Sequence, residues 1–403
     1  MASRYLIPGR TWGIYVHFPW CIQKCPYCDF LSVPAEPRDI PQKTYTEAVL
    51  RELRCRAESL GPLTAHSLFF GGGTPSLWDP EQLGRVIAGV RESFEQTQEL
   101  EVTVECNPSS FDRDKALQLI DAGVNRVSIG VQSLAQAQLE FLGRWHDGNE
   151  AIRAVQDAVQ AGVPRVSADL IYGVFGQGPE QAQQEVQRVA ELGISHLSAY
   201  TLTIEPGTRF GQRKRKGSLP LLEESLVAES YNAVHDALER SGFEHYEISN
   251  FAREGHQSRH NLGYWLGQPY LGLGCGAWGT LPTNERGVSL RYRNLASPER
   301  YMASNHWPLP TDVSQTQKDN SCTVENLSPE TQLTERLMLG LRLQEGLDMV
   351  ATQHELDLDV MTAKRAKVVD RLQQQGNLEV VSGHWRIPQE RWLHADGIIS
   401  QLI

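Results

Sequence analysis

The chain has 403 residues, of which 40% are apolar and 22% charged, and its net charge is −11 with the histidines neutral. This length predicts two or three domains, and the composition is that of a soluble globular protein. The acidic balance argues against nucleic-acid binding, irregularly spaced cysteines argue against a secreted disulfide scaffold, and no run approaches the roughly 20 apolar residues of a membrane helix. Without an apolar signal segment at the N-terminus, the sequence indicates a reducing cytoplasm.

Short apolar strands alternate with helix-sized segments over the first half of the chain. The first predicted strand is 13–17, and the predicted helix 42–60 places its apolar residues on one face. The other predicted strands are 67–70, 100–106, 126–131, 165–171 and 196–202. Because strands alternating with helices form right-handed βαβ units, we predict an α/β fold with a parallel sheet. Six units predict a partial, open (β/α)6 barrel.

The pattern changes after residue 202. The segment 207–220 contains a basic run and is predicted to be a solvated loop, whereas 223–240 is predicted to be a helix. The aromatic, glycine-rich stretch 243–280 shows no clear period. Two predicted helices, 331–343 and 360–374, then precede a β-ribbon, a pattern typical of a small winged-helix-like domain. The predicted domains are the barrel at 1–240, a connecting segment at 241–325 and the C-terminal domain at 326–403.

Three of the seven cysteines lie within eight residues, directly after the first predicted strand: Cys21, Cys25 and Cys28. Three soft thiolates on one short loop suit an iron–sulfur cluster or a zinc ion. Three ligands leave one coordination position open, where a substrate or cofactor can bind. A structural zinc site with His17 or another residue as the fourth ligand is the alternative.

Other polar residues follow the carboxyl ends of the predicted strands, where the working residues of a parallel barrel lie. Gly71 to Gly73 follow the second strand and predict a main chain that a ligand approaches closely, although tight strand–helix packing also explains glycines. Glu105 and Asp169 are acceptors suited to an ammonium group or ribose hydroxyls, with ordinary arginine-paired carboxylates as the alternative. Arg144 suits a carboxylate or a base edge. A ligand with an amino acid end and a ribose would use all of them.

The Cys-x-x-x-Cys-x-x-Cys spacing, with Tyr27 before the third cysteine, resembles the radical S-adenosylmethionine (SAM) signature. The runs Y-V-H-F-P-W-C, G-G-G-T-P, E-C-N-P, S-I-G-V-Q-S and D-L-I-Y-G are similar to the family of oxygen-independent coproporphyrinogen III oxidases and HemW-type heme chaperones. The resemblance implies that the three thiolates hold a [4Fe–4S] cluster whose fourth iron binds SAM, for cleavage to a 5′-deoxyadenosyl radical. By this likeness the SAM-binding residues are Tyr15, Tyr27, Gly72, Gly73, Thr74, Glu105, Gln132, Arg144 and Asp169.

Two features separate the branches of this family. The decarboxylases carry a fourth cysteine where this chain has Phe30, and they carry a longer segment before the first strand, so both features favour the chaperone branch. An H-N-x-x-Y-W run matches a motif associated with heme binding in that branch; its residues are His260, Asn261, Tyr264 and Trp265. The likeness implies His260 as axial ligand and the two aromatics as porphyrin contacts, with a structural histidine as the alternative. One departure is Trp278, which stands where the family has a histidine.

The resemblance therefore implies a carrier that binds a [4Fe–4S] cluster, SAM and heme, and that hands heme to respiratory apoproteins. Its expected place is the cytoplasm, with transient membrane contact where the acceptors are membrane-bound, and a homodimer is left open. The alternative is an enzyme, the radical oxidative decarboxylation of coproporphyrinogen III to protoporphyrinogen IX. A third hypothesis, a radical enzyme acting on RNA through the basic run, is disfavoured by the negative charge, and no nucleic acid partner is expected.

Overall fold

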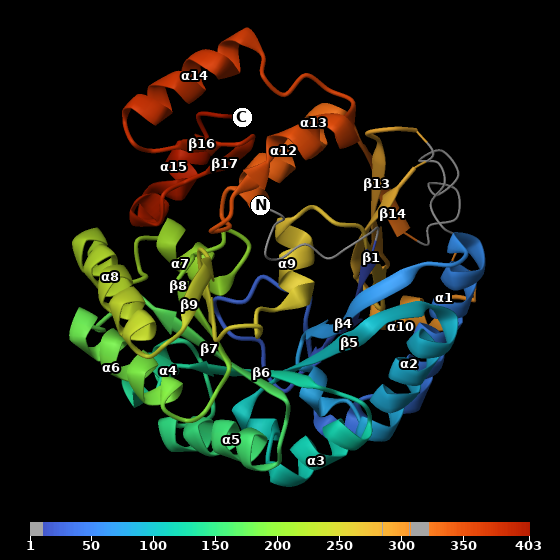
Figure 1. The fold of residues 1–403 in the computed structure, drawn as a ribbon. Coiled ribbons are helices and arrows are strands. Elements are labelled where there is room, and N and C mark those ends of the chain that lie inside the picture. Colours follow the sequence, from blue (N-terminus) through green and yellow to red (C-terminus); the bar gives the residue numbers. More distant parts are fainter. Residues whose placement is uncertain (1–10, 284, 306, 308–321) are drawn as a thin grey trace.

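The computed structural model describes residues 11–283, 285–305, 307 and 322–403. Its centre is a curved twelve-stranded sheet (Figure 1). The six predicted strands form its middle and pair in parallel, which confirms the open barrel-like α/β sheet. Their bounds are β1 (Thr11–Phe18), β4 (Thr64–Gly72), β5 (Glu95–Cys106), β6 (Arg126–Gln132), β7 (Arg165–Tyr172) and β8 (His196–Thr201).

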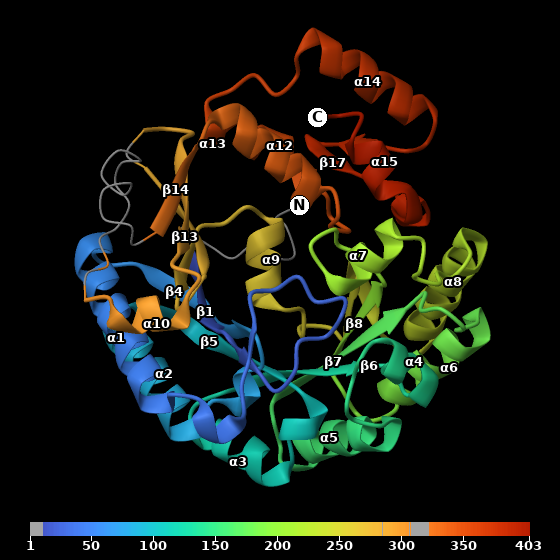
Figure 2. The same ribbon diagram turned by 180° about the vertical axis from the view of Figure 1, so that it is seen from behind.

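Helices cover the outer side of this sheet (Figure 2). They are α1 (Gln42–Leu60), α2 (Pro80–Ser93), α3 (Arg113–Asp121), α4 (Gln136–Phe141), α5 (Gly148–Gln160), α6 (Pro179–Ala190) and α8 (Glu224–Arg240). Local sequence explains their starts: Asp79 caps α2 with Pro80 in its first turn, and Asp147 with Glu150 forms a capping box on α5. Between the layers, side chains such as Val104 are completely buried, each contributing about 1.5–3 kcal/mol.

Further strands extend both edges of the sheet. On one side β11 (Tyr270–Leu273) pairs in parallel with β1, and β12 (Trp278–Pro282), β13 (Ser289–Asn294) and β14 (Cys322–Leu327) follow in antiparallel order. On the other side β10 (Asn250–Ala252) and β9 (Glu244–Glu247) follow β8. The helix α9 (Arg259–Trp265) lies between the two ends (Figure 1). The stretch without a period thus consists of elements too short to display one.

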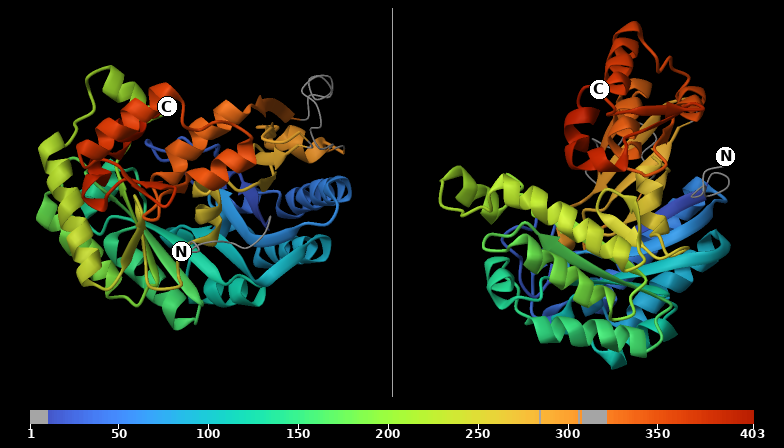
Figure 3. Two further views of the ribbon diagram at one scale, coloured as in Figure 1. Left: turned by 45° about the horizontal axis from the view of Figure 1, so that its top comes forward. Right: turned by 60° about the vertical axis from the view of Figure 1, so that its left-hand side comes forward.

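The C-terminal domain contains α12 (Pro329–Gly340), α13 (Met349–Leu356), α14 (Ala363–Gln374), α15 (Ala395–Ile399) and a sheet of β15 (Leu347–Asp348), β17 (His384–Arg386) and β16 (Glu379–Val381). This confirms the predicted helices and ribbon, while α13 and β15 were not predicted. Figure 3 shows the domain, in orange and red, above the gap between the two ends of the large sheet. Main-chain hydrogen bonds tie it there, from Ile248 to Arg342 and from Gln344 to Tyr246.

The structure differs from two of the sequence predictions. The segment 207–220 is not simply a loop, because it contains the short helix α7 (Arg209–Arg215), which Thr208 caps and which buries Phe210. The strand β14 crosses the predicted boundary at residue 325, and 308–321 lie outside the described residues. Among the helices of the described ranges, none has the length and apolarity to cross a membrane.

Candidate functional site

A cavity of about 230 Å³ lies inside the curve of the sheet. It brings together predicted residues from four parallel strands and from α9: Tyr15, Gly72, Glu105, Asp169, His260, Asn261 and Tyr264. These residues are far apart in the sequence, and they meet because neighbouring strands of a parallel sheet end at the same edge. Phe30, directly after the cysteine loop, also lines the cavity, so the loop lies at its mouth.

Two partly buried carboxyl groups face this cavity. Glu105 Oε2 accepts a hydrogen bond from the Gly72 N–H at 3.2 Å, and Ser128 Oγ donates to Asp169 at 2.9 Å. The pKa of Glu105 is raised to about 8, mainly by burial and also by the charge of Asp169, while the hydrogen bond from the Gly72 N–H opposes the shift. Burial also raises the pKa of Asp169, against hydrogen bonds from Ser198 and Ser128. At neutral pH the Glu105 carboxyl is therefore largely protonated, and a cationic ligand would favour its ionisation.

Cys21 ends the short strand β2 (Trp20–Cys21), and Cys25 and Cys28 lie on the loop that follows it. Thr74 Oγ1 lies 3.3 Å from Cys21 Sγ, and Arg144 Nη1 lies 3.6 Å from Cys25 Sγ. The pKa of the Cys28 thiol is raised to about 11, mainly by burial, and the charges of the other two cysteines contribute to that shift. In the part of the chain that the structure describes, no group of three or more His, Cys, Asp and Glu side chains is arranged as a metal site.

His17 has a different role from the zinc ligand considered above. Its Nε2 lies 2.9 Å from the Leu31 carbonyl and its Nδ1 lies 2.9 Å from the Tyr15 hydroxyl. Since a carbonyl only accepts, Nε2 carries the proton and Nδ1 accepts from Tyr15. Burial lowers the pKa of His17 to about 4, which keeps the ring neutral. His17 thus links the end of the cysteine loop to a residue of the cavity wall, a connection that the sequence analysis missed although Tyr15 and His17 share one face of the strand.

The glycine run serves the packing of the cysteine loop. Gly72 has φ +111°, and a Cβ there would lie 2.4 Å from His17 Cε1. A Cβ at Gly73 would lie 2.5 Å from the Trp20 carbonyl oxygen. The main-chain N–H groups of Gly72, Gly73 and Thr74 donate to Glu105, Phe18 and Trp20, respectively. In this structure the protein itself uses these three N–H groups, so they are not free to donate to a ligand.

Arg144 lies beside the cysteine loop, and neither Arg144 nor Gln132 lines the cavity. Arg144 Nη2 donates to the Gly130 carbonyl at 3.1 Å, in addition to its contact with Cys25. Gln132 ends β6 with φ 64°, a conformation uncommon for a residue with a side chain. Tyr27 follows the second cysteine on the loop itself, and its ring lies 6.4 Å from that of Phe210. The predicted SAM residues thus divide into a cavity group and a loop group.

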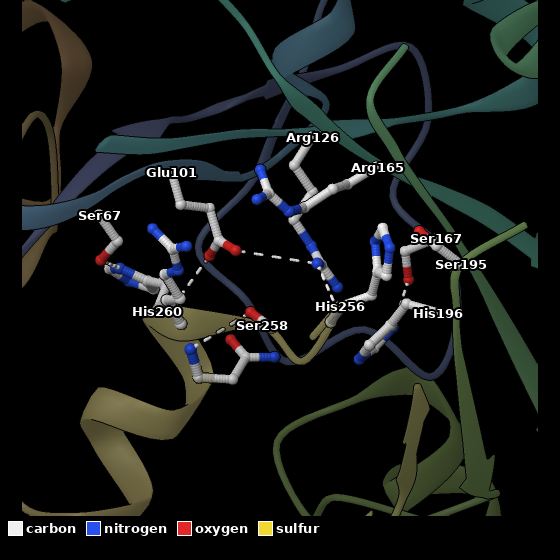
Figure 4. A network of polar contacts seen from close by, with 12 residues as sticks. Ser67, Glu101, Arg126, Arg165, Ser167, Ser195, His196, His256, Ser258 and His260 are labelled. Atoms are coloured by element: carbon white, nitrogen blue, oxygen red, sulfur yellow. Dashed lines mark hydrogen bonds and ion pairs between the residues drawn. The ribbon is translucent and has the colours of Figure 1, made fainter. Parts of the chain in front are cut away.

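His260 is buried and uses all its polar atoms. Its Nδ1 lies 2.8 Å from Ser67 Oγ and its N–H donates to Glu101 (Figure 4). Its Nε2 lies 2.9 Å from the Tyr264 hydroxyl. Burial lowers the pKa of His260 well below the usual value, so the ring is neutral. Tyr264 lines the cavity, whereas Trp265 packs outside it in a small cluster of buried apolar side chains around Leu262. Neither ring nitrogen of His260 is free to bind a metal in this structure.

Several cavity residues were not found from the sequence: Arg126, Ser128, Ser167, His196, Ser198 and Tyr200. Arg126 is buried, donates to the His256 carbonyl at 2.9 Å and lies 3.8 Å from Glu101 (Figure 4). A signal for them existed, because side chains two apart on a strand share a face. Ser128 lies two residues from Arg126, and Ser167 lies two before Asp169. Counting back in steps of two from the predicted residues at the strand ends therefore points to further side chains inside the barrel.

Comparison with known proteins identifies the family of the chain. The model of the radical SAM superfamily matches residues 15–189, and that of the HemN C-terminal domain matches residues 327–394. The heme chaperone HemW of Mycobacterium tuberculosis is 33% identical over 98% of this chain and 96% of its own length. HemW of Escherichia coli is 37% identical over 76% of this chain and 79% of its own.

A mouse relative and a solved structure extend the comparison. The mitochondrial radical S-adenosyl methionine domain-containing protein 1 of Mus musculus is 37% identical over 72% of this chain and 66% of its own. The structure of coproporphyrinogen III oxidase (HemN) from Escherichia coli covers 98% of this chain and 90% of its own, with a TM-score of 0.75 and 22% identity, which shows a shared fold. The chain therefore belongs to the HemW heme chaperone family within the radical SAM superfamily.

Proposed function

We propose that this protein is a heme carrier of the cytoplasm that binds a [4Fe–4S] cluster, SAM and heme and delivers heme to respiratory apoproteins. The observation that carries the proposal is the cavity lined by Tyr15, Glu105 and Asp169, with the cysteine loop at its mouth. Membership of the radical SAM superfamily implies the cluster and SAM. The relatives named heme chaperones supply the proposed cargo.

The donor set of the loop fits an iron–sulfur cluster. Cys21, Cys25 and Cys28 offer three soft ligands within eight residues. Thr74 and Arg144 contact two of the sulfurs and would stabilise their charged forms. The cluster, when bound, supplies one-electron reduction and an open iron for SAM.

In this proposal the two partly buried carboxyl groups receive the ammonium group and the ribose of SAM. Glu105 would bind the ammonium group, since a positive charge ionises a carboxyl whose pKa burial has raised. Asp169, held by Ser128, would accept from ribose hydroxyls. The remaining proposed contacts are Tyr15, Tyr27, Gly72, Gly73, Thr74, Gln132 and Arg144, of which the two glycines act by letting the cysteine loop approach.

Heme binding is proposed at α9, through His260, Asn261, Tyr264 and Trp265. A cavity of about 230 Å³ is smaller than the roughly 300–1,000 Å³ of typical ligand pockets, so heme requires α9 to move. Iron would replace the Tyr264 hydroxyl at His260 Nε2. We assign the cluster and SAM to the barrel at 1–240 and heme to the connecting segment at 241–325, with the domain at 326–403 packed over α9.

Anaerobic reconstitution followed by heme titration tests the proposal. We expect about four irons per chain, loss of iron in the Cys21→Ser, Cys25→Ser, Cys28→Ser triple variant, and normal loading in a Cys55→Ser control. Heme should then bind the loaded protein and pass to an apoprotein acceptor. Zinc without iron would refute the cluster, and formation of protoporphyrinogen IX from coproporphyrinogen III would identify a decarboxylase instead.

A further inference from the structure

His66, on β4, is a buried histidine that the proposed function does not use. Its side chain is 1% exposed, and neither Nδ1 nor Nε2 has a hydrogen-bond partner among the described residues. No other histidine of the described ranges has both ring nitrogens buried and without a partner. Because an unpaired polar group in a protein interior costs stability, folding alone would favour an apolar side chain at this position.

An irregularity in β4 turns His66 toward α9. The register of β4 with β1 and with β5 shifts at this residue, as at a β-bulge. The next residue, Ser67, lies 2.8 Å from His260 of α9 (Figure 4), and the His66 ring lies against Gly263 of the same helix. Successive residues of a regular strand point to opposite faces, so the bulge explains why both side chains reach α9.

The glycine of α9 makes room for the His66 ring. A Cβ at Gly263 would lie 3.2 Å from His66 Cε1 and 3.3 Å from its Nε2. The same position lies 3.4 Å from Gln268 Oε1, which is also buried and without a hydrogen-bond partner in the described part of the chain. Two unpaired polar atoms therefore gather where α9 packs against β4.

The ring of His66 is in the form that binds metals. The pKa of His66 is lowered to about 4, mainly by burial and also by the charge of Arg259, so the imidazole is neutral at physiological pH. His260 and Gly263 are three residues apart on α9 and so share one face of the helix. His66 thus packs against the face of α9 that carries His260.

We propose that His66 is the second axial ligand of bound heme, opposite His260, an inference that rests on the proposed heme site. Heme iron can take one axial ligand on each face of the porphyrin. Since β4 and α9 pack against each other, a porphyrin that enters between them when α9 moves has His260 on one face and His66 on the other. Each imidazole donates a nitrogen lone pair to the iron, and no electron is transferred.

The test compares His66→Leu with a matched control, His245→Leu, in the cluster-loaded protein. His245 is 2% exposed, its Nε2 has no hydrogen-bond partner among the described residues, and its ring stacks on Phe251. Ferric heme and metal-free protoporphyrin IX are the probes, because they share one shape and only heme has iron. Optical titration measures both affinities, and EPR measures the spin state of heme, since the oxidised [4Fe–4S]²⁺ cluster gives no EPR signal.

We expect low-spin heme with two protein ligands in the wild type and in His245→Leu, and high-spin heme with one in His66→Leu. The affinity of His66→Leu for heme should fall about tenfold, with an unchanged affinity for protoporphyrin IX. Added imidazole should restore low-spin heme in His66→Leu and leave the wild-type spectrum unchanged. Without heme, His66→Leu should resist urea at least as well as the wild type, because it removes an unpaired polar group.

Low-spin heme in His66→Leu would overturn the second ligand, and so would high-spin heme in the wild type. In both cases heme binding itself would stand. Equal loss of affinity for heme and for protoporphyrin IX would also overturn it, because His66 would then shape the pocket without binding iron. If the wild type bound no heme, the proposed carrier function would be refuted together with the second ligand.

Discussion

The close approach of Gly72 to His17 predicts a large loss of stability when Gly72 gains a side chain. Replacing Gly72 by alanine places a Cβ 2.4 Å from His17 Cε1, at a residue whose φ is +111°. Atoms cannot remain at that distance, so the imidazole ring or the end of β4 must move. The ring holds Tyr15 and the Leu31 carbonyl, and both hydrogen bonds are expected to break.

The expected loss of stability has two separable costs. Positive φ costs a residue with a side chain about 1–3 kcal/mol. Loss of the two His17 hydrogen bonds adds about 1 kcal/mol each, and more where a buried group stays unpaired. We therefore expect Gly72→Ala to lower the free energy of unfolding by about 3–5 kcal/mol.

Urea denaturation measures this change, provided that the slope with urea is unchanged. Gly162 is a matched control, because its φ is +83° and a Cβ placed there would meet nothing within 4 Å. Gly162→Ala should show the backbone cost alone, about 1–3 kcal/mol. Gly207→Ala, with open space and no positive φ, should change stability by less than about 1 kcal/mol.

A double-mutant cycle isolates the clash. In a His17→Ala background the ring is gone, so Gly72→Ala should cost only about as much as Gly162→Ala. A steric clash with the imidazole would be contradicted if Gly72→Ala lowered stability equally with and without His17. It would also be contradicted if Gly72→Ala cost no more stability than Gly162→Ala.

Three further predictions concern the carboxyl groups and α9. SAM binding near pH 7 should release protons, and the affinity for SAM should rise with pH as Glu105 ionises around its pKa of about 8. Calorimetry in two buffers measures both effects, which Glu105→Gln should abolish; if they persist in this variant, Glu105 is not the group that ionises. Glu52→Gln should lower the free energy of unfolding, measured by urea denaturation, by about 3–5 kcal/mol, because it removes the negative charge that pairs with the buried Arg56. A loss below about 1 kcal/mol would show that this ion pair contributes little to stability. Tyr264→Phe should free Nε2 of His260 and raise the affinity for heme about fivefold in optical titration, whereas His260→Ala should abolish axial ligation from α9. If both variants weaken heme binding equally, His260 is not an axial ligand.

Much of the barrel was predictable because its strands are long and apolar. The bounds of β6 and β7 differ from the predicted ones by a single residue at the end, and α1 agrees at both ends. The segments that escaped prediction are short: α9 and α7 have seven residues each, too few for a period. Their formation depends on tertiary contacts, such as Phe210 with Pro26 and His260 with Ser67.

The local features of this protein follow from the order of its residues. The alternation of strands and helices indicated a parallel sheet, and the spacing of Cys21, Cys25 and Cys28 indicated three thiols within one short segment. Which of the distant residues meet became clear from the folded chain alone. In the folded chain the glycine run packs against His17, and both ring nitrogens of His260 have hydrogen-bond partners. The helix α7 lies beside the cysteine loop. The physical reason is that periodicity shows which face of an element is buried, whereas the partner across that face depends on register and crossover connections that no local pattern contains.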